Sequence, residues 1–209
     1  LSMTGIGIIL ADNIVRLSAG QLPIALFLCM VVSIILGMGL PTSACYVIAG
    51  SIAVPILTKM GVPAFQAHFF VLYFACLSTI TPPVALAAYA AAGIAGERPM
   101  KIGWTAVGLG VSTFIVPFIF VYSPELLGKG EIGTVLWASL TAVIGVTAIS
   151  AASIGFITFP LSGWERILLS GAGLSLIIPG IMTDSLGLGL FSVVLIRNLI
   201  LQRRHRSRS

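Results

Sequence analysis

The stretch LGMGLPTSACY, Leu36 to Tyr46, lies in a long apolar run where a membrane helix is expected, yet it contains two glycines and a proline. The whole run extends from Leu22 to Leu57, which would measure about 54 Å as one α-helix. The hydrocarbon core of a bilayer is about 30 Å thick, so one straight span is excluded. The sequence therefore predicts two helical arms, Leu22 to Leu36 and Ser43 to Leu57, joined by GMGLPT.

The composition of the chain places it in a membrane. Hydrophobic residues make up 58% of the 209 residues and charged residues only 8%, too few for the surface of a soluble domain. About half a dozen segments of the length that crosses a bilayer fit into the chain. Cys29, Cys45 and Cys76 lie in apolar runs without a CxxC spacing, so neither disulfides nor a metal site are indicated. We predict an all-α, polytopic membrane protein.

Two geometries are open for the interrupted run. The arms could be two short crossings with a turn at the far surface, or a re-entrant hairpin whose tip stops inside the membrane. A tip at the surface usually carries charge, whereas this one offers only Gly37, Gly39, Pro41, Thr42 and Ser43. We favour the re-entrant hairpin. Non-helical backbone at membrane depth is tolerated where protein or a water-filled cavity covers it, so such a tip indicates a binding site.

A second long run, Phe65 to Ala95, is broken in the same way by STITPPV, Ser78 to Val84. Pro82 and Pro83 remove two backbone donors and push the preceding residue out of the helical conformation. The pattern predicts one crossing built from two half-helices with an unwound middle. Hydroxyl groups accompany this break at Ser78, Thr79 and Thr81.

The chain as a whole divides into six predicted segments. These are an interfacial helix and connection at 1–21, the re-entrant hairpin at 22–58, the broken transmembrane helix at 64–96, a further transmembrane helix with flanking loops at 97–131, additional C-terminal transmembrane helices at 132–202, and a basic tail at 203–209. We expect Pro117 to kink the span from Ile102 to Tyr122, and Asp184 to cap a helix. The opening LSMTGIGIIL has no basic start and no cleavage signal, which indicates the C-terminal part of something longer.

Basic residues in the loops predict the orientation. If the hairpin enters from outside, Lys59 and Lys129 lie outside and the other loop and tail cations lie inside: Arg98, Lys101, Arg166, Arg203, Arg204, Arg206 and Arg208. This agrees with the positive-inside rule and places the C-terminus in the cytoplasm. The basic tail is therefore interpreted as a topology signal, and no nucleic-acid partner is expected.

Paired breaks at membrane depth are typical of a transporter binding site, where half-helix N-termini face anions and unwound carbonyls coordinate cations. Between Arg16 and Glu97 the ionisable side chains that matter are Lys59 and His68, both near the predicted outer surface. Proton-coupled carriers usually need a carboxylate or histidine within the membrane. A site of carbonyl and hydroxyl oxygens suits a hard cation, so we favour sodium coupling. The alternative is structural, because glycine and proline are common in membrane helices and hydroxyls satisfy kinked backbone.

Three consecutive motifs carry a resemblance to a known family: GMGLPTSACYVIAG at 37–50, GVPAFQAHFFVLYFACLS at 61–78 and ITPPVALAAYAAAGIAG at 80–96. Over about residues 1–125 the chain resembles the large membrane subunit of the tripartite ATP-independent periplasmic (TRAP) transporters. The similarity is greatest to fused permeases that partner TAXI-type receptors. The segment from about residue 132 resembles the extra C-terminal helices of some fused permeases.

The resemblance implies an elevator-type secondary transporter of the bacterial inner membrane, in which two inverted repeats form a mobile domain. This chain would supply the second repeat, and the rest of the permease the first. Sodium and part of the substrate site would lie between the tip residues Gly37, Gly39, Pro41, Thr42 and Ser43 and the linker residues Ser78, Thr79, Thr81, Pro82 and Pro83. Thr42 and Thr81 are the candidate sodium ligands. A periplasmic binding protein of the TAXI type would deliver a small organic anion such as a carboxylate.

Two other function classes are open. One is another ion-coupled transporter, or a channel, that works without a binding protein. The other is a membrane-embedded enzyme, which would need a nucleophile beside a base or paired aspartates. Ser43 and Ser78 have no buried base in the chain, and Asp12 and Asp184 lie near the predicted interfaces. We expect no catalysis and no cofactor other than the coupling sodium ion.

Overall fold

The structure is a computed structural model in which residues 6–178 and 180–206 are described. These residues form α-helices, one short 3₁₀ helix and an isolated β-bridge between Phe156 and Pro160, with no strand among them. The prediction of an all-α, polytopic membrane protein is confirmed. Residues 1–5 of the predicted interfacial segment and 207–209 of the predicted basic tail lie outside the described residues.

Three of the described helices are long and apolar enough to cross a membrane by themselves: Thr42–Lys59, Ile132–Ile154 and the Met182–Ile200 part of the last helix. The chain divides into two compact units, Leu1–Val107 and Gly108–Ser209, which are described separately.

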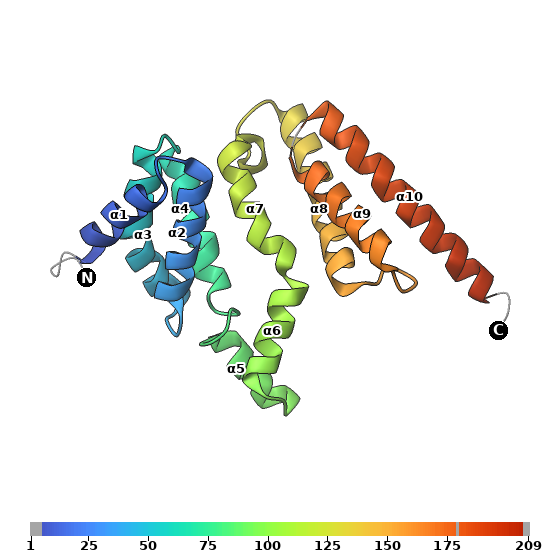
Figure 1. Ribbon diagram of the computed structural model, residues 1–209, viewed down its shortest axis with the longest axis horizontal. Helices are drawn as coiled ribbons and strands as arrows, with labels where there is room; N and C mark the ends of the chain where they lie inside the picture. The colour runs from blue at the N-terminus through green and yellow to red at the C-terminus, as the bar shows by residue number, and fades with distance from the viewer. Residues whose placement is uncertain (1–5, 179, 207–209) are drawn as a thin grey trace. The chain divides into compact units, whose positions relative to one another are not determined.

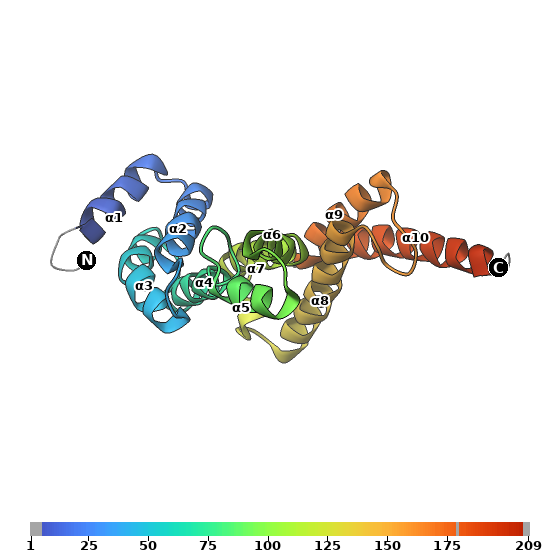
Figure 2. The same ribbon diagram turned by 90° about the horizontal axis from the view of Figure 1, so that it is seen from below.

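The first unit is built around a helical hairpin, α2 and α3, with α4 packed beside both arms (Figures 1 and 2). Its helices are α1 (Ile6–Leu17), α2 (Leu22–Gly37), α3 (Thr42–Lys59), α4 (Ala64–Leu77), α5 (Leu86–Ala95) and α6 (Pro99–Leu109), the last ending just beyond the unit boundary. Phe70 and Phe74 of α4, Leu26 of α2, and Ile56 and Leu57 of α3 are fully buried. This apolar core fixes the hairpin against α4, and so fixes the positions of the two predicted breaks.

The second unit is mainly a bundle of three long helices in which α9 contacts both α8 and α10. Its elements are α7 (Val111–Tyr122), η1 (Pro124–Leu127), α8 (Ile132–Ile154), α9 (Gly163–Ile177) and α10 (Ile181–Arg206). Gly145 of α8 and Gly173 of α9 let the two backbones approach closely. A Cβ built on Gly173 would lie 2.6 Å from the carbonyl oxygen of Gly145, so only glycine fits. Small residues at a helix crossing are typical of membrane bundles.

Buried polar side chains tie the ends of this bundle together. Asn198 of α10 is fully buried, and its Oδ1 accepts hydrogen bonds from the Thr158 hydroxyl at 2.7 Å and from the amides of Thr158 and Phe159. Its Nδ2 donates to the Phe159 carbonyl at 2.9 Å. Glu165, at the start of α9, accepts from Ser162 in a capping box and pairs with Arg197 of α10 at 2.5 Å. The Asn198 side chain therefore anchors the α8–α9 loop to α10.

The expected span from Ile102 to Tyr122 is divided near Gly110, where α6 ends at Leu109 and α7 begins at Val111. Pro117 lies inside α7, which is continuous through it. At this break the Gly108 carbonyl accepts a hydrogen bond from the hydroxyl of Ser153, at 2.6 Å, and the Gly110 carbonyl accepts one from Thr113. Asp184 does not cap α10: it lies in the first turn, where its Oδ2 accepts from the indole N–H of Trp137 at 2.9 Å.

Candidate functional site

The tip of the α2–α3 hairpin is a four-residue turn between Gly37 and Thr42. Gly39 has φ of +79°, in the left-handed region that glycine adopts without strain. The Leu40 amide donates to the Gly37 carbonyl at 3.2 Å, which closes the turn. Pro41 precedes α3 in an extended conformation and contributes no side-chain cap. Glycine and proline thus stop one helix and start the next within a few residues.

The second break is the non-helical linker between α4, which ends at Leu77, and α5, which begins at Leu86. The peptide bond between Pro82 and Pro83 is cis. The linker is closed across its length by a hydrogen bond from the Ala87 amide to the Thr79 carbonyl, at 3.0 Å. The predicted interruption at Ser78 to Val84 therefore corresponds to a compact loop between two half-helices, visible between α4 and α5 in Figure 1.

The two breaks lie against each other. A Cβ built on Gly37 would lie 2.4 Å from both the Ser78 hydroxyl oxygen and the Cys45 sulfur, so the α2 backbone touches the start of the linker. The Ser78 hydroxyl lies 4.0 Å from the Cys45 sulfur, and a Cβ on Gly39 would lie 3.2 Å from Val84. Both Gly37 and Ser78 are buried. The tip and the linker therefore form one site.

Backbone groups at this site lack helical partners. Among the described residues, the amides of Thr42, Ser43 and Ala44 at the start of α3 donate no hydrogen bond. On the linker, no hydrogen bond from the described part of the chain reaches the carbonyl oxygens of residues 80–84. The N-terminus of α3 carries the positive end of its helix dipole, and α4 ends at the linker with its negative end. The arrangement offers N–H groups to an anion and carbonyl oxygens to a cation.

The side chains at the N-termini of α3 and α5 leave these backbone groups uncapped. The N-cap residues are Pro41 and Ala85, and neither makes a side-chain cap hydrogen bond. Serine, threonine, asparagine or aspartate would normally satisfy one of the free amides at such a position. Helices α2, α4, α7 and α8 likewise make no side-chain cap hydrogen bond, whereas α9 has a cap formed by Ser162 and Glu165. The uncapped N-termini are therefore not specific to the breaks, although they leave backbone amides at the start of α3 without a side-chain acceptor.

Three hydroxyl side chains of the linker donate to the end of α4. Ser78, Thr79 and Thr81 donate to the carbonyls of Ala75, Cys76 and Leu77, at 2.7–2.8 Å. Because a hydroxyl oxygen has two lone pairs, it can still serve as a ligand while its proton is engaged. Ser78 is buried and Thr81 half-buried. Because each hydroxyl proton is donated to a carbonyl of α4, the lone pairs of these three oxygens are held in a fixed orientation.

The remaining predicted site residues separate into two groups. Pro82 is buried against Gly103 of α6, where a Cβ would lie 2.9 Å from its ring, and so it anchors the linker. Pro41, Ser43 and Pro83 are exposed, and Thr42 is half-buried at the first position of α3.

Sequence reasoning missed three contact residues. Cys45 lies just after the first break and Val84 is the last residue of the second, so both could have been included by position. Gly103 lies on another helix and has no local signal.

Among the described residues, no acidic or basic side chain is found in the contacts between the tip and the linker, and the one titratable group there is the Cys45 thiol. His68 lies on α4, and its Nδ1 is 2.8 Å from the Tyr46 hydroxyl on the outer surface of α3. Within the described residues, no group of three or more histidine, cysteine or acidic side chains could hold a metal ion. The described part of the site consists of oxygen and N–H groups together with the Cys45 thiol.

A comparison with protein-family models matches residues 1–129 to the tripartite ATP-independent periplasmic transporter, DctM component. The chain belongs to this family. The match includes both breaks and ends before α8. No curated protein and no solved structure matches the chain.

Membership of the DctM family identifies the chain as a membrane component of a TRAP transporter. It is a multi-pass protein of the bacterial inner membrane, and its family works with a periplasmic binding protein and a small membrane subunit. The site of facing breaks lies wholly within the DctM-matched region. Helices α8, α9 and α10 lie outside it.

Proposed function

We propose that this chain is the permease part of a sodium-coupled secondary transporter that takes up a small organic anion, a carboxylate, delivered by a TAXI-type periplasmic binding protein. The observation that carries the proposal is the contact of the hairpin tip with the linker at Gly37 and Ser78. Two interruptions that are separated in the sequence contact each other there. Among the described residues, each leaves backbone groups unpaired: amides at the start of α3 and carbonyl oxygens on the linker.

The coupling ion binds at the linker. Carbonyl oxygens of residues 80–84 and the hydroxyl oxygen of Thr81 are neutral oxygen ligands of the kind that hard cations take. Thr42, across the contact between the breaks, supplies a further hydroxyl. A proton has no carboxylate or imidazole to bind at this place, which favours sodium. The negative end of α4 adds to the attraction for the cation.

The substrate carboxylate binds beside the ion, at the start of α3. The amides of Thr42, Ser43 and Ala44 donate no hydrogen bond among the described residues, and the helix dipole favours an anion there. A cation bound at the linker strengthens this binding by attraction between opposite charges. The two ligands then raise each other's affinity by the same factor, which is the thermodynamic basis of symport.

Movement of the site across the membrane follows an elevator mechanism in this proposal. The hairpin is re-entrant, its tip lies at membrane depth, and the first repeat of the permease completes the mobile domain. The C-terminus lies in the cytoplasm, as the distribution of loop arginines and lysines indicates.

The proposal is tested by sodium activation of uptake in vesicles that contain the full-length transporter and its binding protein. We expect Thr42→Val and Thr81→Val to raise the sodium concentration for half-maximal uptake at least about fivefold, since each removes an oxygen ligand worth about 1 kcal/mol. Thr58→Val is the matched control, because its hydroxyl bonds to its own helix at the far end of α3. Unchanged sodium activation in both site variants, or uptake without the binding protein, would contradict the proposal.

A further inference from the structure

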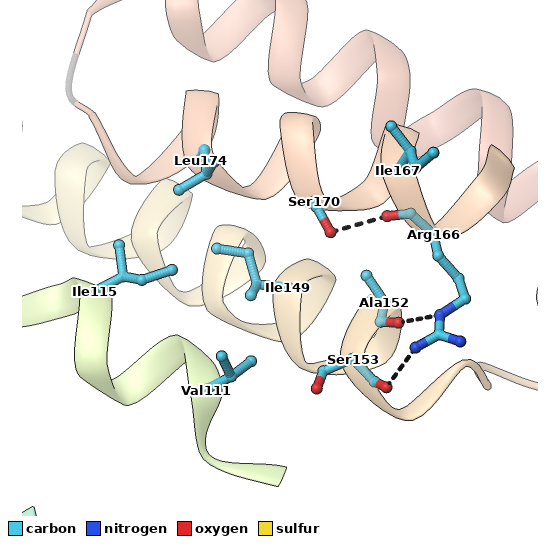
Figure 3. A pocket seen from close by; sticks show the side chains of 9 residues that line it. All are labelled: Val111, Ile115, Ile149, Ala152, Ser153, Arg166, Ile167, Ser170 and Leu174. Atoms are coloured by element: carbon cyan, nitrogen blue, oxygen red, sulfur yellow. Dashed lines mark hydrogen bonds between the residues drawn. The ribbon is translucent and has the colours of Figure 1, made fainter. Parts of the chain in front are cut away.

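The second unit contains an apolar groove that is separate from the proposed transport site. It has a volume of about 470 Å³ and lies between α7, α8 and α9 (Figure 3). Its lining consists of Val111, Ile115, Ile149, Ala152, Ser153, Arg166, Ile167, Ser170 and Leu174. Both hydroxyls are engaged: Ser153 donates to the Gly108 carbonyl and Ser170 to the Arg166 carbonyl. Arg166 therefore supplies the only side-chain hydrogen-bond donors in this lining that remain for an anionic ligand.

Arg166 lies at one end of the groove, and no carboxylate among the described residues forms an ion pair with it. Its Nε donates to the Ala152 carbonyl at 2.7 Å and one terminal nitrogen donates to the Ser153 carbonyl at 2.9 Å. Figure 3 shows the third nitrogen turned away from the apolar side chains. The acid nearest in sequence, Glu165, is paired with Arg197 instead. A guanidinium has five N–H donors, so most of its donors are available to an anion.

The end of the bundle that holds Arg166 has the character of a membrane surface. Trp164 is half exposed beside it, and the Arg197 guanidinium lies 4.6 Å from the centre of the Trp164 ring. Tryptophan is enriched at the headgroup level, and an arginine near the surface attracts anionic lipids. This end of the bundle therefore matches the headgroup region.

The length of the groove along α9 is close to the hydrocarbon thickness of one bilayer leaflet. From Arg166 to Leu174 the α9 backbone advances about 12 Å, close to half of a hydrocarbon core of about 30 Å. Ile167 and Leu174 are exposed along this length and meet lipid in a membrane. The groove is lined at its far end by aliphatic side chains alone. It suits an aliphatic chain whose polar head remains beside Arg166.

We propose that this groove binds an anionic phospholipid, with one acyl chain between α7, α8 and α9 and the phosphate at Arg166. The lipid fills the space between the three helices and compensates the charge of Arg166. Neither sodium nor the transported substrate takes part, so the site is independent of the transport proposal. A partner protein segment in the groove is an alternative occupant that the experiment distinguishes.

The test uses the full-length transporter, purified and delipidated in detergent, with native mass spectrometry to count bound phosphatidylglycerol or phosphatidylcholine. We expect phosphatidylglycerol to bind about fivefold more tightly than phosphatidylcholine, the preference that one arginine near the surface provides. Arg166→Gln should abolish this preference for one bound lipid, whereas Arg166→Lys should retain it. Arg98→Gln is the control, since it removes an exposed arginine from the other unit.

Arg166 also donates hydrogen bonds to carbonyls at the end of α8, so a second variant is needed that changes the groove without changing those bonds. Ser170→Leu places aliphatic bulk in the groove and leaves Arg166 and its two hydrogen bonds to α8 unchanged. It should displace one phosphatidylglycerol while the melting temperature in phosphatidylcholine stays within a few degrees of the parent. The proposal is overturned if Arg166→Gln keeps the parental preference, if Ser170→Leu binds as many phosphatidylglycerol molecules as the parent, or if a protein segment occupies the groove in the assembled transporter.

Discussion

Replacing Gly37 by alanine tests the contact between the two breaks most directly. The added Cβ would lie 2.4 Å from the Ser78 oxygen and the Cys45 sulfur, about 1 Å short of a normal contact near 3.5 Å. Both neighbours are buried, so the tip and the linker must move apart. Overpacking of this kind costs about 1–3 kcal/mol. If ion binding needs the closed contact, the sodium concentration for half-maximal uptake rises by about 5- to 150-fold.

The assay is sodium-dependent uptake into vesicles by the full-length transporter, with membrane insertion measured in parallel. Gly50→Ala is the matched control on α3, because its new Cβ would meet Tyr46 at 3.7 Å, an ordinary contact. Ser78→Gly added to Gly37→Ala removes two of the three clashing atoms and should restore part of the affinity. Parental sodium affinity in Gly37→Ala, at normal insertion, would refute the reasoning.

The C-terminal bundle gives two further predictions. Gly173→Ala should lower the free energy of unfolding by about 1–3 kcal/mol, because its Cβ meets the Gly145 carbonyl. Gly171→Ala on the same helix has nothing within 4 Å of its Cβ and should be neutral or stabilising. Equal melting temperatures for the two variants would exclude the close crossing of α8 and α9. Asn198→Leu should lower the free energy of unfolding by about 2 kcal/mol, since it leaves the amides of Thr158 and Phe159 without their acceptor. Asn13→Leu, at an exposed position, serves as its control. A thermal unfolding curve for Asn198→Leu that superimposes on that of the parent would show that the loop is held by other contacts.

The breaks could be located from the sequence because their causes are local. Glycine and proline act within one or two residues of their position, so the expected arms, Leu22 to Leu36 and Ser43 to Leu57, differ little from α2 and α3. The expected linker at Ser78 to Val84 lies between α4 and α5 for the same reason.

Long-range partners could not be predicted in this way. At the break near Gly110, the Gly108 carbonyl accepts a hydrogen bond from Ser153, 45 residues further along the chain. Asp184 was expected to cap its own helix, but its carboxylate accepts from Trp137, 47 residues away. The buried fit of Gly37 against Ser78 likewise depends on the packing of three helices. Neither hydropathy nor helix-capping patterns contain such information.

The packing of α7 against the bundle has a consequence for how such permeases acquire extra helices. Ile119, with Ile115 beside it, packs on Ile149 of α8 and Ile177 of α9. In a chain that stopped near residue 129, the same isoleucines would be solvated by acyl chains, which are as apolar as the helices that now cover them. Additional helices can therefore be appended to the DctM region by gene fusion without any compensating substitution on the surface that receives them.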